Sequence, residues 1–421
     1  MHVAVLGGGI VGVTSAWYLQ AAGHRVTLIE RQPGVALETS FANGAQLSAG
    51  HAEPWAQPGM LSKLLRWLPR EDAPLLFRLR IDPAQWRWGL QFLAECSPSR
   101  FAYNLQQILA LGVYSRHCHR ELRDTLGLEY DALSLGILNI YENRSDFERA
   151  VSITEQVRAL GYARQPMSAD EAIAQEPALA HHRARLAGAT WTPPDETGDA
   201  HRFCQALAQA CQTAGVDFRL ATTVSRLETL HGRLHAVHVQ DAQGDRERLA
   251  VDACVLAMGS YSGQLLRPLG LQVPIYPMKG YSATLPLLDG KRGPMASVTD
   301  ESSKMVFTRL GQRLRIAGTA EFNGYGLDLN PVRCGALVQR ARQLFPGACD
   351  ESAPHFWTGL RPATPSNRPL IGPTAVEGLF LNAGHGTLGW TESCGSGKAI
   401  SLLVSGQRPE VAFDFLKPDD R

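Results

Sequence analysis

Glycines near the start of the chain have the spacing of a phosphate-binding turn. Gly7, Gly9 and Gly12 form the pattern G-x-G-x-x-G and directly follow 3–6, a short apolar run with β-branched residues. Such a run is typical of a buried parallel strand. The first glycine of the pattern makes the turn, the second lets the backbone approach a pyrophosphate, and the third lets a helix pack on the sheet. The spacing therefore indicates chemistry carried out with a bound dinucleotide.

The residues around these glycines complete a βαβ unit. Residues 13–22 carry small and apolar side chains on one face and end at Gly23, which predicts a helix. The N–H groups and the dipole at the start of this helix favour phosphates. A second predicted strand, 25–29, ends on Glu30, whose carboxylate can accept hydrogen bonds from ribose hydroxyls. This acid disfavours the 2′-phosphate of NADP, and the motif leaves both NAD and FAD open.

The other reactive residues form no site of their own in the sequence. The eight cysteines are scattered without a C-x-x-C pair, which favours reduced thiols over a disulfide framework or a zinc site. The paired histidines lack accompanying ligands, so we predict no metal. The sequence contains neither a nucleophile elbow nor a P-loop lysine. We therefore expect the chemistry to belong to a cofactor.

The composition narrows the class of protein. A length of 421 residues allows two or three domains, and 44% apolar with 19% charged residues is ordinary for a globular protein. The formal net charge of +1 gives no attraction to nucleic acid. No apolar run reaches the ~18 residues that a membrane span needs. Because the chain begins directly with a strand, we expect no signal peptide and a cytoplasmic location.

Two later segments return to the opening unit. A buried strand predicted at 251–257 ends in a small-residue turn at Gly259, which fits a second contact with the ADP moiety of a dinucleotide. Near the end of the chain, a strand at 379–382, the glycine-rich turn 384–389 and a helix at 391–403 repeat the anion-binding arrangement. In a flavoprotein this helix dipole lies near N1 and C2=O, where it favours the negative charge of the reduced flavin.

Other segments predict a second domain or allow two interpretations. Strands at 274–286, 297–310 and 313–319 predict an antiparallel sheet. The polar loop 38–46 is either a cofactor contact or an ordinary surface loop. Segment 53–93 interleaves tryptophans and leucines with arginines and is broken by prolines. It is either a membrane-surface element or a helical insert packed on its own domain, with its arginines reaching outward.

Longer motifs resemble those of a known family. They are Leu37-Glu38-Thr39-Ser40 with Ala42-Asn43, Asp195-Glu196-Thr197-Gly198-Asp199, Gly259-Ser260-Tyr261-Ser262, Tyr276-Pro277-Met278-Lys279-Gly280-Tyr281-Ser282, Phe356-Trp357-Thr358-Gly359-Leu360-Arg361-Pro362 and Gly384-His385-Gly386-Thr387-Leu388-Gly389-Trp390. On these residues the chain resembles the FAD-bearing subunit of bacterial D-amino-acid dehydrogenases, within the D-amino-acid oxidase/glycine oxidase superfamily. The resemblance runs nearly from end to end.

The resemblance implies an α/β fold with a Rossmann-like FAD-binding domain. It further implies a substrate domain with a mixed, largely antiparallel sheet and a helical insert. Both domains are expected to be discontinuous in sequence. The ranges are 1–52, 195–270 and 350–421 for the FAD-binding domain, and 53–194 and 271–349 for the substrate-binding domain.

The resemblance also implies the reaction. A D-amino acid is oxidised to a 2-oxo acid and ammonia by hydride transfer from its α-carbon to N5 of FAD, and the electrons pass to a quinone or another non-oxygen acceptor. An oxygen-using oxidase of the glycine, sarcosine or D-proline type stays open, as does a non-catalytic FAD-binding subunit of a larger complex. A membrane acceptor would make the protein peripheral on the inner face of the cytoplasmic membrane. The oligomeric state is not indicated.

The residues expected to act follow from the matched motifs. Arg361 is expected to anchor the substrate carboxylate, because the similar oxidases hold their carboxylate-binding arginine in Gly-Leu-Arg-Pro and a guanidinium meets a carboxylate bidentately. Tyr276 and Tyr281 are expected to line the pocket, and Lys279 either perturbs the flavin or faces solvent. The expected cofactor-binding residues are Val3, Gly7, Gly9, Ile10, Val11, Gly12, Glu30, Arg31, Thr39, Ser40, Asn43, Gly44, Gln46, Val224, Gly259, Gly384, His385, Gly386, Thr387, Leu388 and Gly389.

The chain departs from the family pattern near the substrate-side loops. Phe41 stands where a small residue is usual, Gly44-Ala45 is in reverse order, and Pro194 replaces a more typical Asn. Asn367-Arg368 replaces an acidic residue followed by glycine. These changes leave the reaction class intact and leave the preferred substrate open, including a cyclic imino acid such as D-proline.

Overall fold

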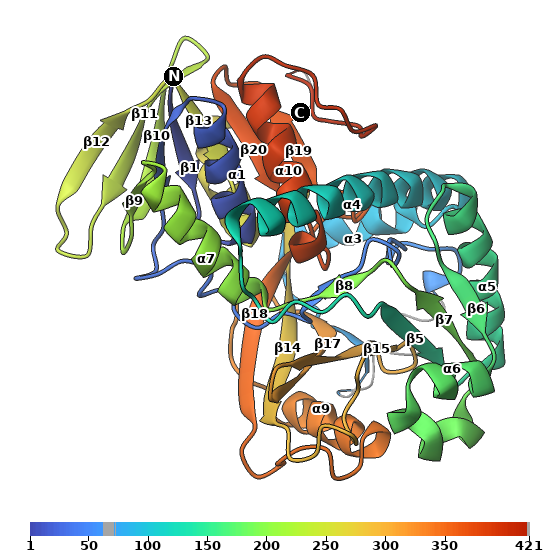
Figure 1. Ribbon diagram of the computed structural model, residues 1–421. Helices are drawn as coiled ribbons and strands as arrows, with labels where there is room; N and C mark the ends of the chain where they lie inside the picture. Colours follow the sequence, from blue (N-terminus) through green and yellow to red (C-terminus); the bar gives the residue numbers. More distant parts are fainter. Residues whose placement is uncertain (62–70, 72, 419–421) are drawn as a thin grey trace.

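A six-stranded sheet forms the part of the fold that begins at the N-terminus (Figure 1). The computed structural model describes residues 1–61, 71 and 73–418. The strand order is β19-β20-β13-β1-β2-β9, and only β19 runs antiparallel to its neighbour. The strands are β1 (His2–Leu6), β2 (Arg25–Ile29), β9 (Asp217–Arg219), β13 (Ala253–Leu256), β19 (Leu370–Pro373) and β20 (Leu379–Ala383). The sequence predicted that the strands near 251–257 and 379–382 join the sheet of the first strand. This is confirmed, because β13 pairs with β1 and β20 pairs with β13.

Helices cover one face of this sheet and a small antiparallel sheet covers the other (Figure 1). The helices are α1 (Ile10–Ala21), α7 (Ala200–Thr213) and α10 (Gly389–Val404), and the small sheet consists of β10 (Thr223–Leu230), β11 (Arg233–Gln240) and β12 (Arg246–Ala250). Val5, Val13 and Ile400 belong to the core under the helices. A β-carbon on Gly397 would lie 2.9 Å from the backbone of Thr14, so the glycine lets α10 cross α1 closely.

A nine-stranded sheet forms the second part of the fold. Its order is β18-β14-β17-β16-β15-β5-β7-β6, with β4 paired to β17. The strands are β4 (Leu75–Phe77), β5 (Ile137–Tyr141), β6 (Gln165–Met167), β7 (Gly188–Thr192), β14 (Tyr276–Pro286), β15 (Ser297–Asp300), β16 (Met305–Leu310), β17 (Arg313–Phe322) and β18 (His355–Ala363). Helix α9 (Pro331–Leu344) packs on β14 and β17. The sheet is mixed, because β15 pairs with β5 and β4 pairs with β17 in parallel.

Helix α4 (Pro98–Leu126) runs beside both parts of the fold (Figure 1). It contacts α10 on one side and shares a core with α5 (Arg144–Ala159), where Leu105 meets Val157. It ends at Gly127, where the sequence 101–126 predicts the end of an amphipathic helix. The other elements are β3 (Gln46–Leu47), β8 (Glu196–Thr197), α3 (Pro83–Glu95), α6 (Ala169–Gln175), α8 (Ser262–Leu266) and the 3-10 helices Pro177–Arg185, Gly259–Tyr261 and Arg267–Leu269.

Two local predictions were wrong in detail. The sequence 145–160 predicts a helix with Ser145 as its N-cap, but helix α5 is capped by Asn143, whose side chain accepts hydrogen bonds from the N–H groups of Ser145 and Asp146. Asparagine and serine are about equally good N-caps, so composition alone did not decide between them. The single strand expected at 297–310 is a hairpin, β15 and β16, because Asp300 accepts bonds from the serines of the intervening turn.

Segment 53–93 is divided between the interior and the surface. Trp88 and Phe92 of α3 are buried in a core with Tyr276 and Phe322, whereas Trp86 on the same helix is 51% exposed. The residues of this segment at 62–70, which include Trp67, Arg66 and Arg70, lie outside the described residues. In the part of the chain that is described, no helix has the length and apolarity needed to cross a membrane.

Candidate functional site

A cavity of about 570 Å³ is lined by residues of both large sheets and by the loop 36–46. All the expected cofactor residues line it except Val3, Gly12 and Gly384, and so do Arg361 and Tyr281. Val3 is fully buried in β1. The structure thus brings together residues that lie more than 300 positions apart in the sequence, at the ends of β1, β2 and β20 and along β14, β17 and β18.

The glycine turn after β1 leaves one position open to the cavity. Gly7 has a φ of +108°, and a β-carbon on Gly12 would lie 1.8 Å from the carbonyl oxygen of Gly7. By contrast, a β-carbon on Gly9 would meet no heavy atom closer than the hydroxyl of Ser40 at 3.5 Å. Gly7 and Gly12 are therefore required by the turn and its packing, whereas Gly9 keeps space free where α1 begins.

Glu30 and Arg31 line the cavity at the end of β2. The carboxylate of Glu30 accepts the N–H of Gly8 at 2.6 Å and that of Gln32 at 2.7 Å. Burial raises the pKa of Glu30, and these two backbone bonds oppose the rise. Each carboxylate oxygen has a second lone pair, so Glu30 can still accept a hydroxyl. The guanidinium of Arg31 lies 3.9 Å from the ring centre of Tyr261.

Several buried polar atoms on the cavity wall have no hydrogen-bond partner in the described part of the chain. They are Oγ1 of Thr319, Oδ1 of Asn382, Nε2 of His385 and Nε1 of Trp390. Burial lowers the pKa of His385 to about 3, so its imidazole is neutral. The first turn of α10 has no side-chain cap, which leaves N–H groups free beside Thr387 and Leu388. Buried polar groups are rarely left unpaired, so these residues fit a polar cofactor that fills the cavity.

Arg361 is a cation in this cavity without an acidic partner. Its Nη1 donates to the carbonyl oxygen of Thr319 at 2.9 Å, and no carboxylate in the described part of the chain forms an ion pair with it. Burial lowers the pKa of Arg361 to about 10, and the positive charge of Arg333 adds to this effect. The sequence also allows Arg361 to form a structural salt bridge, and this alternative has no support among the described residues. A guanidinium held in this way can receive a carboxylate.

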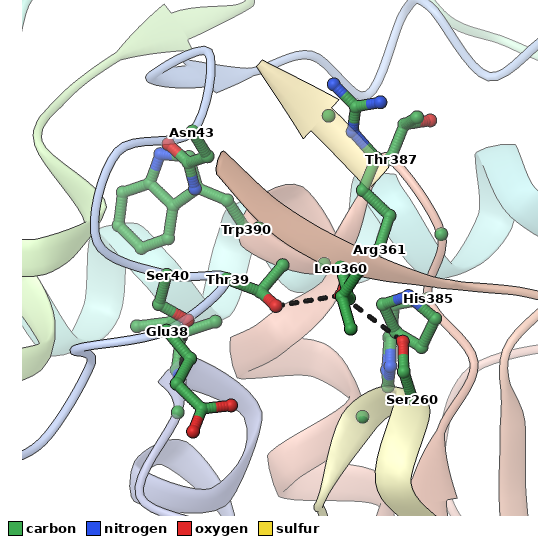
Figure 2. Close-up of a pocket in the computed structure, with 18 of the residues that line it drawn as sticks. Glu38, Thr39, Ser40, Asn43, Ser260, Leu360, Arg361, His385, Thr387 and Trp390 are labelled. Carbon is green, nitrogen blue, oxygen red and sulfur yellow. Dashed lines mark hydrogen bonds between the residues drawn. The ribbon is translucent and has the colours of Figure 1, made fainter. Parts of the chain in front are cut away.

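Two hydroxyls hold the strand that carries Arg361. Figure 2 shows that Thr39 and Ser260 point to the carbonyl oxygen of Leu360, the residue before Arg361. The hydroxyl of Thr39 donates to that oxygen at 2.8 Å and the hydroxyl of Ser260 donates at 3.3 Å. Thr39 lies in the loop after β2 and Ser260 in the 3-10 helix after β13, so the two hydroxyls fix β18 of the second sheet relative to segments that follow strands of the first sheet.

The remaining expected side chains have different surroundings. The hydroxyl of Tyr281 donates to Glu321, and burial raises the pKa of Tyr281. Tyr276 does not line the cavity, because its hydroxyl points to Asp82 at 2.9 Å. Lys279 was expected either to perturb the flavin or to face solvent. It does not line the cavity and is not exposed, because its ammonium is buried within 3.4 Å of the carboxylate of Glu321.

The sequence did not reveal one group of charged residues on the cavity wall. His51, Glu53, Glu301 and Lys304 all line the cavity and form ion pairs with one another. They come from a loop near residue 50 and from the turn between β15 and β16. No spacing in the sequence links these two segments, and only the strand order of the second sheet brings them together.

Comparison with known proteins identifies the class. Residues 2–403 match the family model described as FAD dependent oxidoreductase. The chain therefore belongs to the family of FAD-dependent oxidoreductases, and FAD is its cofactor. The expected fold class is confirmed, because solved members of this fold align along the whole chain.

The relatives confirm the resemblance found in the sequence. The chain is 53% identical over 417 residues to a D-amino acid dehydrogenase of Dechloromonas aromatica, covering 99% of this chain and 100% of that protein. It is 47% identical to a D-amino acid dehydrogenase of Paramagnetospirillum magneticum, covering 100% and 98%. Glycine oxidase from Geobacillus kaustophilus has a TM-score of 0.75 at 22% identity, with 98% and 96% of the chains covered, and so shares the fold.

Proposed function

We propose that the protein oxidises D-amino acids to 2-oxo acids and ammonia. When bound between the glycine turn after β1 and the start of α10, FAD would supply the hydride acceptor for the substrate α-carbon. The neutral amine loses a proton to solvent as the C–N double bond forms, and water then hydrolyses the imino acid. Close relatives along the full length carry the name D-amino acid dehydrogenase, which disfavours an oxygen-using oxidase and a non-catalytic subunit.

The single observation that carries the substrate class is the guanidinium of Arg361, which has no acidic partner among the residues that the structure describes. A partly buried cation without a carboxylate is unfavourable, and an α-carboxylate would supply the missing charge and two hydrogen bonds. Holding the carboxylate also fixes which face of the α-carbon is presented to the flavin. Tyr281 lines the same part of the cavity, and its hydroxyl is occupied by Glu321, so we assign it to the wall and not to proton transfer.

For the cofactor, we propose that the start of α1 at Gly9 and Ile10 holds the pyrophosphate and that Glu30 accepts the ribose hydroxyls. The turn from His385 to Leu388 and the first residues of α10 would hold the flavin ring, where the dipole of α10 would favour negative charge on the reduced ring. The openness of Gly9 to the cavity and the lack of a side-chain cap on α10 support this arrangement.

We retain the division into an FAD-binding domain (1–52, 195–270 and 350–421) and a substrate-binding domain (53–194 and 271–349) as a proposal. The two large sheets support it. Strand β18 lies at the boundary: it falls within 350–421, yet its hydrogen bonds are to β14 of the second sheet. On this view Arg361 stands where the two domains meet.

We propose a quinone or another membrane-bound molecule as the electron acceptor. The support is the outer face of α3 and the loop before it, where Leu79, Ile81, Trp86, Leu90 and Leu93 are exposed. The inner face of α3 packs with Met60, which lines the cavity. An apolar surface next to the cavity suits a peripheral contact with a bilayer.

Anaerobic mixing of the purified holoenzyme with a panel of D- and L-amino acids tests the proposal. We expect D-amino acids to bleach the flavin absorbance and L-amino acids to leave it unchanged. Rapid peroxide formation in air, matching substrate consumption, would identify an oxidase. A flavin that no amino acid reduces would refute the proposed reaction.

A further inference from the structure

The charged group on the cavity wall lies beside the anchor for the substrate carboxylate. Arg361 donates to the carbonyl oxygen of Thr319, and the N–H of Thr319 donates to the carbonyl oxygen of Lys304 at 3.4 Å. Lys304 is thus a direct neighbour of the residue that holds Arg361. Both residues line the same cavity as the glycine turn of the cofactor site.

The backbone at this point is strained. Thr319 has a φ of +56° and Lys304 a φ of +54°, in the left-handed region that β-branched residues such as threonine rarely adopt. The hydroxyl of Thr319 is also buried, and no described residue forms a hydrogen bond with it. Strained residues and unpaired buried polar atoms concentrate at ligand sites, because binding there compensates for their cost. Both features place a ligand contact between Arg361 and Lys304.

Four charged or titratable side chains line this part of the cavity, and we call them the charged wall. They are Lys304, Glu301, His51 and Glu53. Lys304 pairs with Glu301, the imidazole of His51 lies 3.2 Å from Glu301 and 3.0 Å from Glu53, and Arg164 pairs with Glu53 from behind. Burial acts against a charged imidazole, but the two carboxylates outweigh it, so the pKa of His51 is raised. Within the wall the two carboxylates thus lie against Lys304 and His51, and Arg164 adds a cation behind them, away from the cavity.

The cations of the charged wall are also the more accessible charges. The side chains of Lys304 and His51 are 35% and 29% exposed, whereas those of Glu301 and Glu53 are 8% and 11% exposed. A molecule in the cavity therefore meets the ammonium and the imidazole before it meets either carboxylate. Asp195, which holds the neighbouring Gly50, is 1% exposed and does not line the cavity.

We propose that the charged wall is a subsite for the substrate side chain and that it selects D-amino acids whose side chain ends in a carboxylate. The inference rests on the proposed function, with the α-carboxylate on Arg361. A dicarboxylic D-amino acid then has one anchor at each end, and Lys304 with His51 receives the distal one. D-glutamine, which has the same shape without the charge, lacks the second ionic contact.

The test compares D-glutamate with D-glutamine in anaerobic flavin reduction by the holoenzyme. We expect kcat/KM for D-glutamate to exceed that for D-glutamine by about tenfold or more in the wild type, from one charge-assisted contact. Lys304→Gln should lower this ratio toward one. Glu301→Gln should raise it, because it frees the ammonium of Lys304. Since the two variants are expected to act in opposite directions, a general loss of structure cannot reproduce both effects.

Lys291→Gln is the matched control, because Lys291 is exposed and does not line the cavity, and the ratio should stay at its wild-type value. Equal rates with D-glutamate and D-glutamine, or faster reduction by D-lysine than by D-glutamate, would overturn the inference. If D-alanine reduces the flavin in either case, the proposed function survives and only the subsite fails. If no D-amino acid reduces it, the proposed function itself fails.

Discussion

The guanidinium of Arg361 lies where a side chain on Gly280 would begin. A β-carbon built on Gly280 would be 2.4 Å from both Cζ and Nη2 of Arg361. The two residues belong to the neighbouring strands β14 and β18, in which Gly280 pairs with Gly359. The guanidinium can therefore lie against the bare backbone of β14 and reach the carbonyl oxygen of Thr319 on the next strand. If Arg361 anchors the substrate carboxylate, as we propose, the lack of a side chain at Gly280 is a requirement of that site.

Gly280→Ala should displace Arg361 from this position. We expect KM for a D-amino acid to rise roughly 10- to 100-fold, with a smaller change in kcat, because misplacing the anchor by about 1 Å weakens binding and alignment. Flavin content should stay stoichiometric. Gly335→Ala in α9 is the control, since a β-carbon there meets nothing within 4 Å, and its kinetics should match those of the wild type. Normal KM in Gly280→Ala would separate Arg361 from substrate binding.

Removing the cation tests the anchor directly. Arg361→Ala is expected to lower kcat/KM by roughly 30- to 1000-fold, since a lost charged partner costs ~2–4 kcal/mol. Arg361→Lys should recover only part of the activity, because an ammonium cannot form the planar bidentate contact. Steady-state kinetics with one D-amino acid and a soluble dye measures both variants. Unchanged kinetics in the alanine variant would place the carboxylate anchor elsewhere.

The glycine turn allows cofactor binding and folding to be separated. Gly9→Leu fills open space at the start of α1, so the protein should fold but lack the yellow colour of bound FAD. Gly12→Ala places a β-carbon 1.8 Å from the carbonyl oxygen of Gly7, so it should disturb the β1–α1 packing and lower the yield of folded protein. Absorbance at the flavin band and circular dichroism distinguish the two results. Stoichiometric FAD in folded Gly9→Leu would contradict the proposed pyrophosphate position.

The sequence revealed the parts of the site that local patterns encode, and it missed those that depend on tertiary pairing. The turn at Gly7 and the helix starting at Gly389 follow from spacing that one strand, one turn and one helix impose. The roles of Gly280 and of Lys279 depend on which strands flank β14. The ammonium of Lys279 forms ion pairs with Glu321 and Asp328. Both residues are distant from Lys279 in the sequence, so no local pattern predicts these pairs. The charged wall depends most on the tertiary structure. The pairing of β15 with β5 and the position of the loop at Gly50 bring its members together.

Asp195 should make the stability of the protein depend on pH. It is buried, accepts the N–H of Gly50 at 3.2 Å and the hydroxyl of Tyr162 at 2.6 Å, and burial raises its pKa to about 7. The folded state therefore holds the proton more tightly than the unfolded chain, whose Asp pKa is about 4. The contribution of Asp195 is fully present below pH ~4 and is lost as the pH rises toward 7.

Asp195→Asn should remove this dependence, since an amide does not titrate. The free energy of unfolding of the wild type, measured relative to that of the variant, is expected to fall by about 1.4 kcal/mol per pH unit between roughly pH 4 and 7. Urea unfolding at a series of pH values measures it. Asp124→Asn, at a side chain that is 75% exposed, should show no such slope. A constant difference between wild type and Asp195→Asn would contradict the assignment.

The outer face of α3 should mediate contact with a bilayer. Trp86 and Leu90 are 51% and 70% exposed, and inserting a large apolar side chain contributes about 1.5–3 kcal/mol when burial is complete. Replacing both by serine is therefore expected to weaken co-sedimentation with anionic vesicles at least about tenfold. Replacing Leu160 and Leu230, which are exposed on other elements, is the matched control and should have little effect. Reduction of a soluble dye, measured beside it, shows that each variant is folded. If the wild type does not bind vesicles, the membrane role of α3 fails, while the oxidation of D-amino acids is unaffected.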